Sequence, residues 1–308
     1  MNEKRLGEKS LDILAVLKKY TNEKNILINE PMKNHTTFKI GGNADFVVLP
    51  ENIDEVINLI KFLKEEKINY FVMGNGSNLL VKDEGYRGVI IKLGSNFSDI
   101  KVSGNIIKAS SGALLTKISN IAQKESLKGF EELSGIPGSL GGAIYMNAGA
   151  YGKEIKNVLK SVTFLNENLE VETRDIKDLK MEYRKTLFSE NKYIVLEAQI
   201  ELEKGDSCMI LERIREVTKM RTDKQPLNFP SAGSTFKRPV GHFAGKLIED
   251  ANLKGYTLGG AKVSEKHAGF IINYNSATFL DVINLTEEVK KIVKEKFNVE
   301  LELEVEIL

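Results

Sequence analysis

The spacing of hydrophobic residues predicts alternating strands and helices in the first third of the chain. Three apolar runs predict strands: 45–50, 69–73 and 88–93. Between the first two, Asn52 and Glu55 have capping-box spacing and should open a helix. The apolar residues that follow share one face of this helix: Ile53, Val56, Ile57, Ile60 and Leu63. The second strand leads directly into GNGSNLL (74–80), so we expect a strand, helix, strand unit that ends in a loop of small residues.

The middle of the chain predicts a hairpin, a helix and a second set of strands. The hairpin turns at Ser103–Asn105, and a helix follows with these core residues: Leu114, Ile118, Ile121 and Ala122. The segment 135–152 is rich in glycine, and strand signals resume at 161–165 and 193–202. These changes of pattern divide the chain into regions 1–98, 99–204 and 205–308.

The last region predicts three helices and a closing strand. The first helix carries Ile210, Ile214 and Val217, the second covers about 242–252, and the third starts at Thr278 with Asp281 in capping position. Over 299–308 apolar and acidic residues alternate. One predicted strand face holds Leu301, Leu303, Val305 and Ile307, and the other holds Glu300, Glu302, Glu304 and Glu306.

Composition excludes several classes of function. The 308 residues contain 44 Lys and Arg against 43 Asp and Glu, so no overall charge favours nucleic acid or a membrane surface. Cys208 is the only cysteine, and no apolar run is long enough to span a membrane. The three histidines lack metal-ligand spacing, so we expect no metal. A cytoplasmic protein without nucleic-acid or membrane partners is expected.

Two glycine-containing segments are candidates for holding a ligand. GNGSN (74–78) is typical either of an ordinary tight turn or of a backbone that approaches an anion, and it lacks the third glycine of the dinucleotide fingerprint. The segment 135–152 suits either close backbone packing or a cofactor surface. Together they favour one extended ligand that carries phosphates.

Arg184 and the acidic row at the C-terminus each have two interpretations, one as solvated surface residues and one as functional residues. Arg184 is typical of a solvated surface arginine or of a bidentate clamp on a carboxylate or phosphate. The acidic row at the C-terminus is usually solvated, but one member could point into a cleft.

Six motifs, in order, resemble the UDP-N-acetylenolpyruvoylglucosamine reductase (MurB) family and cover nearly the whole chain. They are TTFKIGG (36–42), GNGSNLL (74–80), SGIPGSLGGAIYMNAGAYG (134–152), MEYRKTLF (181–188), SAGSTFKRP (231–239) and ELEVEI (302–307). The resemblance implies an α+β protein with a two-subdomain FAD-binding fold of the vanillyl-alcohol oxidase type and a C-terminal α+β substrate-binding domain. The three regions above would be FAD-binding subdomain 1, FAD-binding subdomain 2 and this substrate-binding domain.

The resemblance also implies bound FAD, with NADPH as the reductant. FAD would lie between the first two regions, its diphosphate on the first loop and its flavin end covered by the glycine-rich segment. The implied cofactor contacts are Gly74, Asn75, Gly76, Ser77, Asn78, Leu79, Ile136, Pro137, Gly138, Gly141, Gly142 and Gly149. The reduced flavin would pass a hydride to the enolpyruvyl group of a UDP-sugar in peptidoglycan precursor synthesis.

Three residues match the catalytic positions of the family. Arg184 would stabilise charge on the substrate carboxylate together with Glu304, which would act as a protonated hydrogen-bond donor or polarising group. Ser234, after Gly233, would donate a proton to the adjacent carbon. Glu302 lies on the same predicted face as Glu304, so the register of the motif is what distinguishes them.

Five further residues are expected to bind substrate. Lys224 matches a family lysine near the substrate diphosphate, and His267 falls where the family has a polar substrate contact. Lys237 and Arg238 would add positive charge beside the diphosphate, and Tyr183 would flank the nicotinamide or the substrate. For His267 a structural role is the alternative. The sequence departs from the family pattern at Lys39 and at Glu306, where arginines are usual. Only 189–192 separates the Arg184 motif from the next strand, which resembles the subclass without a loop whose tyrosine closes over substrate.

Two other functions remain open from the sequence. An alcohol oxidase of the same flavin fold would need a base where this chain has Ser234, and a non-catalytic nucleotide or UDP-sugar binding protein would need no such serine. We expect a monomer or a weak oligomer.

Overall fold

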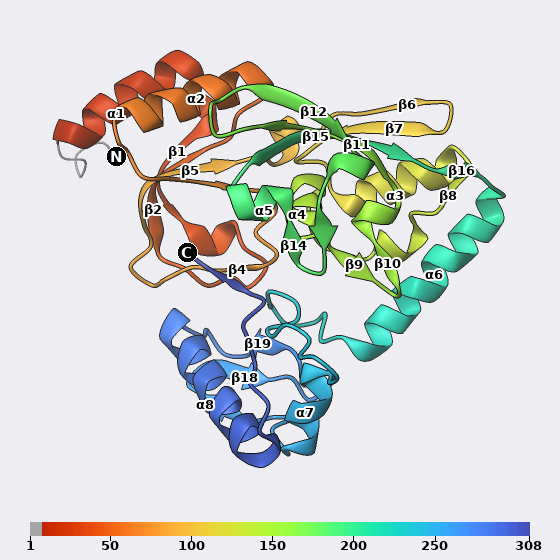
Figure 1. Cartoon of the computed structure of the whole chain (residues 1–308). Coiled ribbons are helices and arrows are strands. Elements are labelled where there is room, and N and C mark those ends of the chain that lie inside the picture. Colours follow the sequence, from red (N-terminus) through yellow and green to blue (C-terminus); the bar gives the residue numbers. More distant parts are fainter. Residues whose placement is uncertain (1–7) are drawn as a thin grey trace. The chain divides into compact units, whose positions relative to one another are not determined.

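The computed structural model describes residues 8–308 (Figure 1). Its α-helices are α1 (Glu8–Tyr20), α2 (Ile53–Glu65), α3 (Leu115–Lys124), α4 (Leu140–Tyr145), α5 (Leu187–Asn191), α6 (Ser207–Lys224), α7 (Ala244–Asp250) and α8 (Phe279–Phe297). The strands of the first half are β1 (Ile26–Pro31), β2 (Asn43–Val48), β3 (Tyr70–Met73), β4 (Leu79–Leu80), β5 (Tyr86–Lys92), β6 (Ile100–Ser103), β7 (Ile106–Ser110), β8 (Leu127–Lys128), β9 (Gly149–Ala150) and β10 (Lys153–Glu154). The remaining strands are β11 (Leu159–Leu165), β12 (Val171–Asp175), β13 (Met181–Glu182), β14 (Lys185–Thr186), β15 (Ile194–Glu201), β16 (Glu203–Lys204), β17 (Thr257–Leu258), β18 (Ala261–Val263), β19 (Ile271–Asn273) and β20 (Glu306–Ile307).

The chain forms two compact units. The first contains residues up to 28, 46–75 and 88–220, and the second contains 29–45, 76–87 and 221–308. The first unit has two separate hydrophobic cores, and the second has one. The three regions that the sequence delimits stay a prediction.

One core of the first unit forms around the predicted strand, helix, strand unit. The sheet has the order β1-β2-β5-β3, and β3 runs parallel to β5. Helix α2 begins after Asn52, whose side chain accepts a hydrogen bond from the Glu55 amide at 2.9 Å, so the predicted cap is confirmed. Its apolar face is buried at Val56, Leu59, Ile60 and Leu63.

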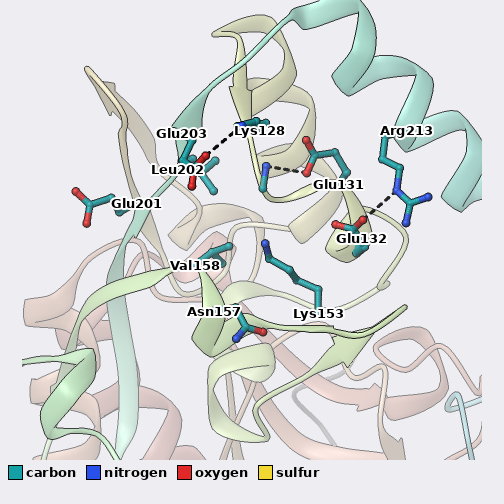
Figure 2. Close-up of a pocket in the computed structure, with 11 residues that line it drawn as sticks. Lys128, Glu131, Glu132, Lys153, Asn157, Val158, Glu201, Leu202, Glu203 and Arg213 are labelled. Carbon is teal, nitrogen blue, oxygen red and sulfur yellow. Dashed lines mark hydrogen bonds and ion pairs between the residues drawn. The ribbon is translucent and has the colours of Figure 1, made fainter.

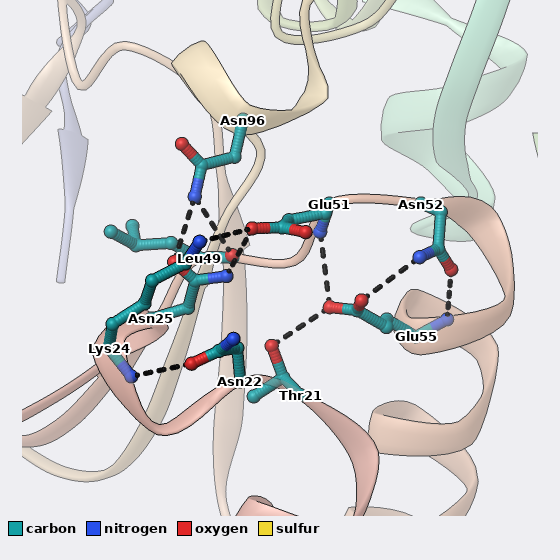
Figure 3. A network of polar contacts seen from close by, with 9 residues as sticks. All are labelled: Thr21, Asn22, Lys24, Asn25, Leu49, Glu51, Asn52, Glu55 and Asn96. Carbon is teal, nitrogen blue, oxygen red and sulfur yellow. Dashed lines mark hydrogen bonds and ion pairs between the residues drawn. The ribbon is translucent and has the colours of Figure 1, made fainter.

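A polar network fixes the start of α2 to the chain that follows α1 (Figure 3). Glu55 accepts hydrogen bonds from the Thr21 hydroxyl at 2.8 Å and from the Glu51 amide at 3.1 Å. Asn25 donates to the Glu51 carboxylate at 2.9 Å. This hydrogen bond and the nearby Lys24 hold the pKa of Glu51 below its ordinary value.

The other core of the first unit lies on a five-stranded antiparallel sheet of order β12-β11-β15-β7-β6. The β6–β7 hairpin confirms the predicted turn, with Gly104 at φ 63°. Helix α3 buries Leu115, Ile118 and Ala122, but Leu114 is 41% exposed, so its prediction as a core residue is wrong. Leu114 precedes the helix with extended dihedral angles, which breaks the helical spacing.

The second unit packs α7 and α8 with the sheet β17-β18-β19 (Figure 1). Helix α8 begins after Thr278, and Asp281 completes the predicted capping box. Hydrogen bonds from the backbone of Thr278 and Gly260 lower the pKa of Asp281. The predicted helix over 242–252 is real but shorter, because it begins at Ala244 and ends at Asp250.

The predicted strand over 299–308 is mostly wrong. Only Glu306–Ile307 forms a strand, pairing in parallel with β4, and Leu303 makes an isolated bridge to Phe236. A bend at Val305 interrupts the alternation, so Ile307 is 42% exposed although Leu301 and Val305 are buried. Among residues 8–308, no helix is both long and apolar enough to cross a membrane.

Candidate active site

The GNGSN loop connects β3 to β4 without an intervening helix. Asn75 donates a hydrogen bond to the Pro137 carbonyl at 2.6 Å, which joins this loop to the glycine-rich segment. Gly74 makes this approach possible, because a Cβ there would lie 2.1 Å from the Ser139 hydroxyl oxygen. Gly76 has φ 64°, a conformation that favours glycine. The two candidate loops therefore meet at Gly74 and Asn75.

The glycine-rich segment packs against its surroundings in the same close way. Gly141 donates to the Ser111 carbonyl at 2.8 Å, and a Cβ on Gly141 would lie 2.7 Å from the Ser111 Cβ. The hydroxyls of Ser111 and Ser139 are buried and have no hydrogen-bond partner among residues 8–308. Such hydroxyls beside crowded glycine backbones fit a bound group that supplies acceptors, as FAD would.

The remaining predicted cofactor residues lie in or beside short elements of the two segments. Ile136 and Gly138 precede α4, Gly142 lies within it, and Gly149 begins β9. Ser77, Asn78 and Leu79 belong to the second unit together with Gly76. The sequence did not predict the short helix α4, because glycine is a poor helix former.

Arg184 lies in a two-residue connection between β13 and β14 of the first unit. Its backbone is left-handed, with φ 56°, and its guanidinium lies 4.9 Å from the centre of the Tyr183 ring. Its Nη1 donates to the Asn147 carbonyl at 3.3 Å. Tyr183 is 49% exposed, so the hairpin presents an aromatic ring and a cation at the surface of its unit.

SAGSTFKRP lies in the second unit, bends at Gly233 and Thr235 and has one left-handed residue. Gly233 has φ 79°, and a Cβ there would meet no atom within 4 Å. The glycine is therefore required by conformation and not by space. Ser234 follows with an exposed side chain.

Thr235 fixes this turn, and sequence reasoning missed it. It is 2% exposed; its amide donates to the Gly269 carbonyl at 2.8 Å and its hydroxyl accepts from the Ile271 amide at 2.9 Å. Its carbonyl accepts from the Glu304 amide at 2.9 Å. Ser234 and Glu304 therefore lie on neighbouring segments. Nothing in the sequence marked Thr235 apart from its place in the motif.

The two candidate glutamates have different surroundings. Glu302 is exposed and pairs with Lys237 at 3.2 Å. Glu304 is half-buried, and its carbonyl accepts from the Asn78 side chain at 2.9 Å. Asn78, predicted as a cofactor residue, thus holds the backbone of Glu304 within the second unit.

The predicted substrate cations are exposed. Lys224 ends α6, and the Arg238 guanidinium stacks on the Phe243 ring at 3.8 Å. His267 is different: its Nδ1 accepts from the Gly269 amide at 3.1 Å, and burial lowers its pKa. The ring is also packed edge-on against Phe270. These contacts favour the structural reading of His267.

A cavity of about 400 Å³ in the first unit lies apart from these residues (Figure 2). Its walls are mostly charged, and two ion pairs, Lys128–Glu203 at 3.1 Å and Arg213–Glu132 at 3.0 Å, stand along it. None of the residues that the sequence predicts as functional lines it.

Comparisons with known proteins agree in both halves of the chain. Residues 44–173 match a family described as FAD binding domain, and residues 225–308 match UDP-N-acetylenolpyruvoylglucosamine reductase, C-terminal domain. The chain is 53% identical over 292 residues to UDP-N-acetylenolpyruvoylglucosamine reductase of Caldanaerobacter subterraneus subsp. tengcongensis, covering 95% of this chain and 96% of that relative. It is 47% identical over 298 residues to the protein of the same name from Clostridium perfringens (strain SM101 / Type A), covering 97% and 98%. The crystal structure of UDP-N-acetylenolpyruvylglucosamine reductase (MurB) from Thermus caldophilus matches with a TM-score of 0.78 at 32% identity, covering 92% of this chain and 97% of that one.

Proposed function

The chain belongs to the UDP-N-acetylenolpyruvoylglucosamine reductase family, and we propose that it reduces UDP-N-acetylglucosamine enolpyruvate to UDP-N-acetylmuramate with NADPH. It is an FAD-dependent oxidoreductase of α+β fold, with an FAD-binding domain and the C-terminal domain of this family. The reaction contributes to peptidoglycan synthesis. An alcohol oxidase or a non-catalytic binding protein would not explain the match of residues 225–308 to the reductase C-terminal domain. It would also not explain the 53% and 47% identity to reductases over nearly the whole chain.

The residues proposed to hold FAD are Gly74–Leu79 of the first loop together with Ile136, Pro137, Gly138, Gly141, Gly142 and Gly149 of the glycine-rich segment. Bound FAD supplies the hydride transfer from NADPH to the enolpyruvyl group. The crowding at Gly74 supports this assignment, since any side chain there would meet Ser139 and separate the two segments. The buried hydroxyl of Ser139 supports it further, since a bound group can satisfy it.

The chain's own residues must meet two further demands. Negative charge develops on the substrate carboxylate, and a proton must reach the carbon next to it. We assign the first task to Arg184, whose guanidinium can hold a carboxylate through two parallel hydrogen bonds, and to Glu304, which would act in its protonated form as a hydrogen-bond donor. We assign the proton to Ser234, whose exposed hydroxyl can regain a proton from water after each turnover.

One observation carries this assignment: Ser234 stands on a left-handed glycine turn that Thr235 fixes to the segment of Glu304. A serine hydroxyl is a poor acid, so its position must supply most of its effectiveness. The hydrogen bonds of the Thr235 amide, carbonyl and hydroxyl hold the backbone next to Ser234 in such a fixed position.

The test separates the two half-reactions in stopped flow under anaerobic conditions. Ser234→Ala should leave flavin reduction by NADPH within about twofold and slow reoxidation by the enolpyruvyl sugar by roughly a hundredfold or more. Thr218→Ala, on the exposed side of α6, is the control and should change neither rate. Equal losses in both half-reactions would contradict the role of Ser234 as proton donor. A protein whose flavin band does not bleach with NADPH would contradict the proposed activity.

The finer assignments are also proposals. We place the chain in the subclass without the tyrosine loop, because only α5 and a two-residue link separate β14 from β15. Lys224, Lys237, Arg238 and Tyr183 are assigned to the UDP-sugar. The pairing of Lys237 with Glu302 reduces what Lys237 can contribute to an anion. A cytoplasmic location and a monomer or weak oligomer stay predictions.

A further inference from the structure

A buried asparagine of the glycine-rich segment supports the hairpin that carries Arg184. Asn147 is 0% exposed and has φ 46°. Its side-chain amide donates to the Glu182 carbonyl at 3.1 Å, and its side-chain oxygen accepts from the Lys156 amide at 3.3 Å. Its own carbonyl accepts from the Arg184 guanidinium at 3.3 Å. One residue therefore contacts both the backbone and the cation of the hairpin.

The hairpin needs such support. Its strands have two residues each, and an isolated hairpin is at best marginally stable in water. Neighbouring contacts come from the same part of the chain: the Thr186 hydroxyl donates to the Tyr145 carbonyl at 2.7 Å, and Lys156 donates to the Met181 carbonyl at 3.3 Å. Among these contacts, only those of Asn147 reach the arginine itself.

We propose that Asn147 is a positioning residue that fixes the Arg184 guanidinium for the substrate carboxylate. The inference rests on the proposed role of Arg184. An arginine side chain loses much rotamer freedom when it is held in one geometry, and a long cation on a mobile turn clamps a carboxylate poorly. Asn147 removes part of this cost before substrate binds, since it holds the turn through Glu182 and the guanidinium through its carbonyl.

The variant Asn147→Asp tests this most directly. Aspartate tolerates the left-handed conformation and keeps the acceptor for Lys156, but it loses the donor to Glu182 when ionised. In the FAD-loaded enzyme we expect reoxidation by the enolpyruvyl sugar to slow by about tenfold or more, with flavin reduction by NADPH unchanged. Asn147→Gly, which also tolerates positive φ, serves if the aspartate variant does not fold.

Asn191→Asp is the matched control. Asn191 also donates to a backbone carbonyl, that of Leu187 at 2.9 Å, but it is exposed and this hydrogen bond lies within α5 and not in the hairpin. The change in side chain and net charge is identical, and both half-reactions should stay within about twofold of the parent rates.

A double-mutant cycle of Asn147→Asp with Arg184→Gln tests whether Asn147 acts through Arg184. If Asn147 acts through Arg184, its substitution should cause no further loss once Arg184 is replaced. A loss of the same size in both backgrounds would overturn the inference, as would an Asn147→Asp enzyme with unchanged half-reactions. If Arg184→Gln itself leaves reoxidation unchanged, the proposed role of Arg184 fails. This result differs from one in which both single substitutions slow reoxidation and their effects add, which contradicts only the role of Asn147.

Discussion

Gly74→Ala should destabilise the protein, because it forces apart the two loops that meet at Ser139. The added carbon would lie 2.1 Å from the Ser139 hydroxyl oxygen and 3.3 Å from the Ser139 Cβ. The hydroxyl must therefore move by about 1 Å or more. Ser139 is 2% exposed, so there is little room for this movement. Gly74 itself has no positive φ, and the cost is one of packing alone.

The expected magnitude is that of overpacking a buried site, about 1–3 kcal/mol. In domains of this size each kcal/mol lowers the melting temperature by about 2–4 °C, so we expect a decrease of about 2–12 °C. Circular dichroism on the FAD-free protein measures it without any contribution from cofactor binding. A parallel titration of FAD, followed by flavin fluorescence, should show weaker binding.

Two further variants make the explanation refutable. Gly142→Ala adds the same carbon on α4, at 3.6 Å from the same Ser139 oxygen, which is an ordinary contact. Its melting temperature should equal or exceed that of the parent, since alanine favours the helix. In a Ser139→Ala background, Gly74→Ala should lose at least half of its effect. Equal melting temperatures for Gly74→Ala and Gly142→Ala, or an undiminished effect without the hydroxyl, would refute the packing argument.

Three other outcomes are expected. Glu304→Gln should slow flavin reoxidation by the sugar at least tenfold more than Glu302→Gln, because Glu302 is exposed and paired with a lysine; stopped flow would contradict this by showing the reverse order. UDP-sugar binding should weaken as salt rises, and less steeply in Lys224→Gln, because exposed cations are screened; titration calorimetry that finds no salt dependence would argue against this diphosphate contact. His267 should titrate below its ordinary value of 6.5, because burial disfavours its charged form; NMR of the imidazole would contradict this with a pKa at or above 6.5. Between pH 6.5 and the lower pKa of the folded state, His267 is protonated in the unfolded chain but not in the folded one. His267 therefore lowers the free energy of unfolding as the pH drops from 6.5 through the folded pKa.

The sequence alone determined much of the secondary structure and the family. The cap at Asn52, the capping box at Thr278 and the β6–β7 hairpin follow from local spacing, because each depends on hydrogen bonds between residues a few positions apart. The ordered motifs likewise indicated the flavoenzyme family that the comparisons show.

The tertiary structure decided what depends on distant partners. The alternation over 299–308 predicts one strand, but pairing with Phe236 and with β4 divides it at Val305. Alternation places Glu304 and Glu302 on one strand face, and only the structure shows their different surroundings: Glu302 is exposed, whereas Glu304 is half-buried with backbone bonds to Thr235 and Asn78. The supports at Asn147 and Thr235 are equally invisible in the sequence, because Asn147 binds the Glu182 carbonyl 35 residues away and Thr235 binds the Ile271 amide 36 residues away. Local hydrogen bonds leave a periodic pattern in the chain, while the buried polar contacts that position a site leave none.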